Sequence, residues 1–251
     1  MRADPIRLLR SIWIWTACAA LILLWLPILG AVRLFDRDPL RLVTARWFRR
    51  LGRALAKVSP WRIHIEGLQH IAPGQVYVVV GNHQSLGDIP LISHLPLDTK
   101  WLAKAELFRI PVVGWMMRAA GDIPVDRANR RKAAQALLQC AHYLRRRCSV
   151  MFFPEGTRSP DGEVLPFNDG PFQLAIREQA PVLPLVVEGS GNALPRHSFL
   201  FGGVQDIYLN VLPPVPVAGW NVKETAALRD QVRQRIIDEL SRLRQTPNCL
   251  K

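Results

Sequence analysis

The sequence has little cysteine and no cysteine pairing pattern. Its four cysteines are Cys18, Cys140, Cys148 and Cys249, and no two of them stand in a C-x-x-C spacing. The six histidines do not cluster with the cysteines, so no metal-ligand spacing is present and we expect no metal site. We predict that all four thiols are reduced and have no chemical role, which suits the cytoplasm.

Acidic residues are also scarce, because 20 Asp and Glu stand against 33 Lys and Arg, which gives a formal charge of +13. This balance favours anionic partners, namely nucleic acid, an anionic membrane or phosphorylated substrates. No helix-turn-helix, zinc or RNP-type motif supports nucleic acid. Many of the positive charges lie beside an apolar segment, where an anionic bilayer surface explains them. We therefore expect lipid partners and no nucleic acid.

Charged residues are absent between Arg10 and Arg33, which leaves enough length for the roughly 20 apolar residues of a bilayer-spanning helix. The segment is too long for an ordinary signal-peptide core, and no convincing cleavage site follows it. Basic residues flank it on both sides and are more numerous after Arg33, which predicts a cytoplasmic position for that side. The basic flanks also permit a helix that enters one leaflet and returns, broken near Pro27 and Gly30. The sequence is consistent with both arrangements.

The segment from Leu34 to Val58 mixes apolar side chains with arginines, which is typical of an amphipathic helix at an anionic lipid surface. Four of the eight tryptophans precede residue 50, as interfacial tryptophans of a membrane protein would: Trp13, Trp15, Trp25 and Trp47. We expect a membrane-anchoring helical segment at residues 1–58 and a second domain at residues 59–251. The predicted location is the inner (cytoplasmic) membrane, with the second domain on its cytoplasmic face.

Strands and helices alternate along residues 59–251, which predicts an α/β fold. We expect a layered, largely parallel central sheet flanked by helices and preceded by the N-terminal membrane-associated helical segment. The expected strands are 61–66, 76–80, 99–103, 122–126, 150–153, 182–187 and 207–212, and the expected helices are 89–94, 128–147, 172–178 and 225–243.

The first candidate site follows residues 76–80, an apolar and mostly β-branched run that is typical of a strand buried on both faces of a sheet. A glycine-asparagine turn ends the run, and His83 and Asp88 follow five positions apart. A neutral imidazole is the natural base for a hydroxyl proton, and a carboxylate can hold its other ring nitrogen. This pattern predicts a general base, His83, and an orienting partner, Asp88.

Three further features come later in the chain. The stretch from Lys104 to Arg127 has a basic residue at each end, and FPEGTRS at residues 153–159 comes directly after an apolar strand. A proline-bearing strand surrounds Pro184. Together with NHQSLGD at residues 82–88, these four motifs resemble those of the glycerolipid acyltransferase family. The similarity is greatest to the 1-acyl-sn-glycerol-3-phosphate (lysophosphatidate) acyltransferases and covers about residues 60–215.

The chain departs from this family pattern at one place. After FPEGTRS such enzymes often carry a basic residue in a stretch like FKKG, whereas this chain has Phe167-Asn168-Asp169-Gly170. The departure bears on the identity of the acceptor more than on the reaction.

The resemblance implies transfer of a fatty acyl group from acyl-CoA or acyl-carrier protein to the sn-2 hydroxyl of lysophosphatidate, which gives phosphatidate. The acceptor hydroxyl would attack directly, with His83 and Asp88 as the general base pair, and neither a metal nor another cofactor is expected. The expected substrate-binding residues are Arg158, Glu155, Gly156, Thr157, Lys104 and Arg127.

Five of these six substrate-binding residues have an expected contact. Arg158 is the first choice for the acceptor phosphate, with Lys104 and Arg127 in support, because a guanidinium binds phosphate in a bidentate way. Backbone N–H groups around Gly156, or a nearby cation, are expected to stabilise the oxyanion. Glu155 is expected either to orient Arg158 or to contact the glycerol.

Two other functions remain open at this point. One is the same chemistry with a different lyso-lipid acceptor. The other is a lipid hydrolase that uses Ser85, His83 and Asp88 as a triad. Ser85 lies only two residues from His83, and the chain has no G-x-S-x-G nucleophile elbow.

Overall fold

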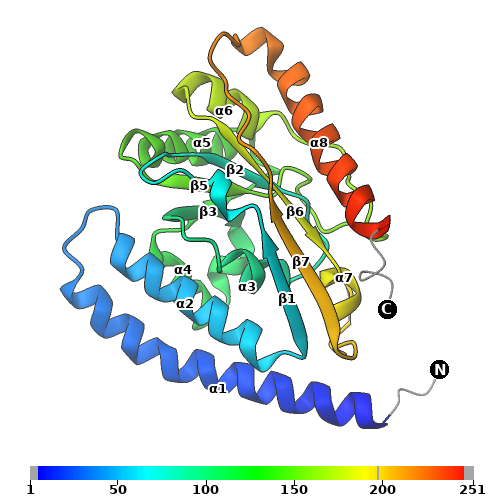
Figure 1. Cartoon of the computed structure of the whole chain (residues 1–251). Coiled ribbons are helices and arrows are strands. Elements are labelled where there is room, and N and C mark those ends of the chain that lie inside the picture. The colour runs from blue at the N-terminus through cyan, green and yellow to red at the C-terminus, as the bar shows by residue number, and fades with distance from the viewer. Residues whose placement is uncertain (1–4, 197, 246–251) are drawn as a thin grey trace.

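A seven-stranded sheet forms the centre of the protein (Figure 1). The computed structural model describes residues 5–196 and 198–245, so the flanking Arg2 and the predicted free thiol of Cys249 lie outside the described residues. The strand order is β1-β7-β6-β2-β5-β3-β4. The strands are β1 (Trp61–Glu66), β2 (Val78–Gly81), β3 (Thr99–Lys104), β4 (Ile123–Val125), β5 (Ser149–Phe152), β6 (Val182–Glu188) and β7 (Gln205–Val211).

Neighbouring strands pair in parallel, except that β6 and β7 are antiparallel. The predicted α/β class with a largely parallel sheet is therefore confirmed. The helices, including three short 3-10 helices, are α1 (Pro5–Phe35), α2 (Leu42–Val58), η1 (Leu68–His70), α3 (Asp88–Ile92), η2 (Ala105–Arg109), α4 (Val113–Ala120), α5 (Arg130–Arg145), α6 (Gly170–Glu178), α7 (Ser190–Ala193), η3 (Val222–Glu224) and α8 (Thr225–Gln245).

Helices cover both faces of the sheet, which explains why β2 is apolar throughout. Val78 and Val80 point into a core shared with α5, α6 and α8. Val79 points into the opposite core, together with Leu91 of α3 and Trp101 of β3. Successive side chains of a strand face opposite ways, so only a continuous apolar run can serve two cores.

The chain reverses direction between α1 and α2. The predicted re-entrant arrangement would place the reversal earlier, near Pro27 and Gly30. The helix α1 continues through Pro27 to Phe35, so the break expected near Pro27 and Gly30 is not present. The prediction of one helix over Leu34–Val58 is wrong at its start, because residues 36–41 form the turn. The buried Asp36 carboxylate stabilises this turn by accepting hydrogen bonds from the Thr44 N–H (2.8 Å) and hydroxyl (2.6 Å).

The helix α1 lies along the domain over its whole length (Figure 1). Near its N-terminus, Arg7 and Arg10 donate hydrogen bonds to the carbonyls of Phe201 (3.0 Å) and Gly202 (2.6 Å). Near its C-terminus, Leu29 is buried in a cluster with residues of α2 and α4. By length and composition α1 could cross a membrane, with a mean hydropathy of 2.2 and 17% of the most apolar window buried.

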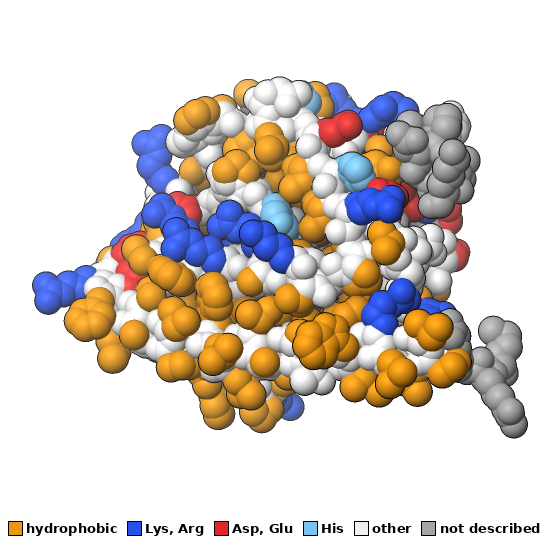
Figure 2. Space-filling model, turned by 60° about the horizontal axis from the view of Figure 1, so that its bottom comes forward, with side chains coloured by type: hydrophobic (Ala, Val, Ile, Leu, Met, Phe, Trp, Pro, Cys, Tyr) orange, Lys and Arg blue, Asp and Glu red, His pale blue; other side chains and the backbone are white. Residues whose placement is uncertain are grey.

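The outer face of α1 carries an exposed apolar band (Figure 2). We use this name for the exposed α1 side chains Ile6, Leu8, Leu9, Ile12, Trp13, Trp15, Leu23, Leu24, Ile28, Leu34 and Phe35. Of the four early tryptophans, two belong to this band. The other two, Trp25 and Trp47, pack against each other with ring centroids 5.9 Å apart, so they connect α1 to α2.

Candidate active site

The loop that bears His83 is fixed where β2 and β6 end side by side. The β2 strand ends at Gly81, and the Asn82 side chain then pairs with Val187 of β6. The amide N–H of Asn82 donates to the Val187 carbonyl, and the Asn82 side-chain oxygen accepts from the Val187 N–H, both at 2.8 Å. Asn82 therefore extends the sheet by one side chain and sets the position of His83.

The His83 ring is oriented by a buried carboxylate. Its Nδ1 lies 2.6 Å from Oδ2 of Asp88, the first residue of α3, which has no exposed surface. The same Oδ2 accepts the backbone N–H groups of Gln84 (2.8 Å) and Ser85 (3.1 Å). The other oxygen, Oδ1, accepts the hydroxyl of Ser190. Because a carboxylate accepts at Nδ1, the neutral ring carries its proton there and presents Nε2 as a base.

One face of the His83 ring rests on Phe153, the first residue of FPEGTRS. The two rings are stacked with centroids 3.9 Å apart and an interplanar angle of 16°. The His83 side chain is 15% exposed, and Nε2 has no hydrogen-bond partner among the residues that the structure describes. An incoming hydroxyl can therefore reach Nε2 without displacing a protein group.

The Glu155 carboxylate binds the backbone of the loop that bears His83. Its Oε1 accepts the backbone N–H of His83 at 2.8 Å, and its Oε2 accepts the N–H of Leu165 at 3.3 Å. The expectation that Glu155 orients Arg158 is therefore wrong. Burial raises the pKa of Glu155 to about 7, against the opposite effect of these two hydrogen bonds.

This buried carboxyl predicts a pH-dependent stability. A native-state pKa near 7 instead of 4.5 means that the native state keeps a proton that the unfolded chain loses between these values. The contribution of Glu155 to the free energy of unfolding should therefore fall by about 3 kcal/mol as the pH rises from 4.5 to 7. In Glu155→Gln this decrease should be absent in urea unfolding of detergent-purified protein. The exposed Glu106→Gln is the control, and an unchanged pH slope in Glu155→Gln would contradict the prediction.

The remaining predicted residues differ in exposure and in their distance from the FPEGTRS turn. Gly156 has a positive φ of 78°, which favours glycine, and Nη1 of Arg127 lies only 3.1 Å from the position that a Cβ would occupy there. Thr157 is exposed and Arg158 is half-buried. Lys104, at the end of β3, is exposed and lies 3.5 Å from Glu106. The structure thus brings Arg127 against the FPEGTRS turn and leaves Lys104 in solvent.

The turn borders two cavities. An apolar cavity of about 230 Å³ is lined by Arg127, Phe153 and Gly156 together with side chains from β3, β4 and α5. A polar cavity of about 450 Å³ is lined by Gln84, Arg196 and Arg244. Among the described residues, no group of three or more His, Cys, Asp or Glu is placed to hold a metal ion.

The hydrolase triad is contradicted by the position of Ser85. This residue is fully buried, and its hydroxyl donates to the Leu194 carbonyl at 2.6 Å while accepting the Gly87 N–H at 3.1 Å. The His83 nitrogen that faces a carboxylate is already paired with Asp88. Ser85 therefore stabilises the loop and does not serve as the nucleophile of a triad.

Two residues near the site were assigned no role from the sequence. Ser190 begins α7 directly after β6 and supplies the second hydrogen bond to Asp88. Arg196 donates to the Arg158 carbonyl at 2.6 Å. The available signal was the position of Ser190 just after a strand. The sequence could not identify Asp88 as the partner of Ser190, because no local pattern predicts that β6 lies beside β2.

Comparison with known proteins decides the family. A family model described as Acyltransferase matches residues 62–188, which contain the whole His83 and Glu155 region. The chain belongs to the acyltransferase family. The sequence resemblance to acyltransferases is thereby confirmed.

Several named acyltransferases are similar to this chain. The chloroplastic 1-acyl-sn-glycerol-3-phosphate acyltransferase BAT2 of Brassica napus is 31% identical over 89% of the chain and 64% of its own length. The 1-acyl-sn-glycerol-3-phosphate acyltransferase alpha of Homo sapiens is 35% identical over 70% of the chain and 62% of its own length. The chain thus spans less than two thirds of either relative.

A solved acyltransferase structure has the same fold over nearly the full chain. It is the crystal structure of the 1-acyl-sn-glycerophosphate (LPA) acyltransferase PlsC from Thermotoga maritima. The TM-score is 0.81 at 28% identity, and the similarity covers 95% of this chain and 96% of that chain. The similarity therefore includes α1 and α2 as well as the sheet.

Proposed function

We propose that the protein transfers a fatty acyl group from the thioester of acyl-CoA or acyl-carrier protein to the sn-2 hydroxyl of lysophosphatidate. The products are phosphatidate and the free thiol. The observation that supports this reaction most is the His83 ring, held by buried Asp88 at Nδ1 and open at Nε2. The names of the relatives supply the substrate class.

In the proposed reaction, Nε2 of His83 takes the acceptor's hydroxyl proton while the oxygen attacks the thioester carbonyl. Asp88 stabilises the imidazolium that forms. The tetrahedral intermediate then expels the thiolate, which takes the proton back from the imidazolium. Positioned general-base catalysis of this kind is typically worth about 10²–10⁴-fold.

Positive charge around the FPEGTRS turn suits both the oxyanion and the acceptor phosphate. The Gly156 N–H already donates to the Phe153 carbonyl at 3.1 Å, so it is not free for the oxyanion. The guanidinium groups of Arg158 and Arg127 remain. We assign the phosphate to Arg158, whose side chain pairs with no carboxylate among the described residues. Arg127 lies against the turn, and Lys104, which is exposed and lies 3.5 Å from Glu106, is kept as a further support for the phosphate.

Arg158→Gln should therefore raise KM for lysophosphatidate about tenfold to a hundredfold, because a charge-assisted hydrogen bond is worth about 1.5–3 kcal/mol. Monoacylglycerol, which has no phosphate, should be acylated equally by wild type and variant. Arg158→Lys should recover part of the loss, since it keeps the charge but not the bidentate geometry. The exposed Arg235→Gln is the matched control. A similar loss with monoacylglycerol would refute the assignment of the phosphate to Arg158.

The geometry of α1 supports a position in one leaflet. Because the domain contacts α1 near both ends, α1 cannot stand across a bilayer unless the domain enters it too. We propose that the apolar band lies in the cytoplasmic leaflet of the inner membrane, with the active site on the cytoplasmic face. Residues 1–58 would then be the anchor and residues 59–251 the catalytic domain, which meets a lipid acceptor and a soluble donor.

The direct test is an acylation assay with detergent-purified protein. Lysophosphatidate should be converted to phosphatidate with acyl-CoA or acyl-carrier protein as donor. Absence of product with both donors, from protein that unfolds cooperatively, would overturn the proposed acceptor. Acylation of a different lyso-lipid in the same assay would support the alternative acceptor.

A further inference from the structure

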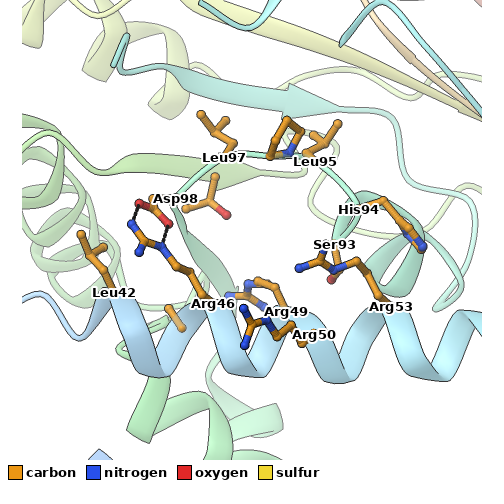
Figure 3. A pocket seen from close by; sticks show the side chains of 13 residues that line it. Leu42, Arg46, Arg49, Arg50, Arg53, Ser93, His94, Leu95, Leu97 and Asp98 are labelled. Carbon is orange, nitrogen blue, oxygen red and sulfur yellow. Dashed lines mark hydrogen bonds and ion pairs between the residues drawn. The ribbon is translucent and has the colours of Figure 1, made fainter. Parts of the chain in front are cut away.

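A basic pocket lies on α2, away from the active site. It has a volume of about 330 Å³ and is formed between α2 and the segment 93–99 that leads into β3 (Figure 3). Four arginines of α2 line it: Arg46, Arg49, Arg50 and Arg53. Arg49, Arg50 and Arg53 follow Arg46 by three, four and seven residues, and this spacing places all four on one face of the helix.

Two of these arginines are neutralised by carboxylates. Arg46 makes two hydrogen bonds to Asp98, at 2.7 Å and 2.6 Å. Arg49 pairs with buried Asp122 and lies over the Trp101 ring at 4.6 Å. The Nε of Arg49 is nevertheless buried without a hydrogen-bond partner among the described residues. This nitrogen is enclosed by protein, so Arg46 and Arg49 are both engaged within the molecule.

The other two arginines have no compensating carboxylate. Arg50 is exposed and stacks over the Trp47 ring at 4.6 Å, and Arg53 is exposed beside Ser93. Among the described residues, neither forms an ion pair. His94 is the remaining titratable group at the pocket, and its Nδ1 lies 3.1 Å from the carbonyls of Pro90 and Leu91. The pocket thus carries two uncompensated positive charges.

The topology separates this pocket from the catalytic residues. His83 follows the carboxyl end of β2, whereas Asp98 and Thr99 lie at the amino end of β3. The strands β2 and β3 both run parallel to β5, which lies between them in the sheet. The pocket therefore lies toward the opposite edge of the sheet and is not the acceptor site.

The pocket lies instead next to the apolar band. The helix that bears the four arginines packs directly on α1, and Trp47 of α2 packs on Trp25 of α1. Figure 2 shows Lys and Arg side chains gathered beside the hydrophobic face of the molecule. If the apolar band is immersed in acyl chains, basic groups one helix away lie at headgroup depth.

We propose that this pocket binds the phosphate group of an anionic phospholipid, with Arg50 and Arg53 as its principal ligands. Guanidinium groups bind phosphate oxygens in pairs, and the two uncompensated charges match an anionic headgroup. The bound headgroup fixes α2 to the membrane surface while α1 occupies the acyl region. The protein thus holds a lipid at a site that takes no part in the reaction.

The test is flotation of full-length protein with vesicles of phosphatidylcholine alone or mixed with phosphatidylglycerol. Phosphatidylglycerol should increase the vesicle affinity of the wild type. In the double variant Arg50→Gln/Arg53→Gln this increase should be about tenfold smaller. The control Lys223→Gln/Arg235→Gln removes the same charge from exposed positions near and on α8 and should bind as wild type does. Equal thermal unfolding midpoints in detergent would show that both variants are folded.

Three outcomes would overturn the proposal. Equal losses in both double variants would mean that net charge alone attracts the protein to the vesicle. Binding of Arg50→Gln/Arg53→Gln at the wild-type level would show that Arg50 and Arg53 are not ligands of the lipid phosphate. Inorganic phosphate that stabilises the wild type but not this variant against heat, with vesicle binding unchanged, would show that the pocket takes free phosphate rather than a lipid headgroup.

Discussion

Replacing His83 by alanine should lower kcat for phosphatidate formation about 10⁴-fold. The variant keeps Asp88, the FPEGTRS turn and the arginines, but it has no base for the hydroxyl proton. KM for lysophosphatidate should change little, because the phosphate is bound by Arg158 and not by the ring. The measurement is product formation under saturating donor, followed separately for kcat and KM.

The matched control for this prediction is His142→Ala, which removes an exposed imidazole from α5. It should retain wild-type activity. The His83 ring is stacked on Phe153 at the edge of the site, so its removal should leave the thermal unfolding midpoint within a few degrees of the wild type. Phosphatidate formation by His83→Ala within about tenfold of wild type would contradict the general-base mechanism.

Replacing Asp88 by alanine should damage both stability and activity. Its buried carboxylate accepts four hydrogen bonds, from the His83 ring, two backbone N–H groups and the Ser190 hydroxyl. Without it, buried donors are left unpaired, and the free energy of unfolding should fall by about 3–5 kcal/mol. The activity of the folded fraction should fall about as far as in His83→Ala, because nothing then orients the ring.

Two smaller changes separate these effects. In Asp88→Asn the side-chain oxygen can still accept the N–H groups, and its amide can donate to Ser190, so stability should be retained better than activity. Ser190→Ala removes one hydrogen bond and should cost about 1 kcal/mol with a modest loss of activity. Urea unfolding should therefore place Asp88→Asn closer to the wild type than kcat does, whereas Asp88→Ala should be lowest in both measurements. A stable and active Asp88→Ala would show that the carboxylate has neither role.

The α1–α2 boundary shows how local signals were partly missed. The mixed apolar and basic character of residues 34–58 predicted one helix, yet the turn at residues 36–41 interrupts the pattern. Asp36 and Asp38 are the residues that accept the first N–H groups of the turn and of α2. Short acidic side chains are common just before the first residue of a helix, so the sequence contained the information that predicts this boundary.

Features that depend on near neighbours in the chain could be predicted from local sequence patterns. Strand and helix positions follow from apolar periodicity, and the His83–Asp88 pair is close because both residues lie in one loop and the helix start that follows it. The arginines of α2 share a face because of helical spacing. Contacts between distant segments are known only from the folded structure. Glu155 contacts the His83 backbone, and Ser190 contacts Asp88, only because β5 and β6 flank β2 in the sheet. Strand order depends on how the helices pack against both faces of the sheet, and no local pattern in the chain encodes it.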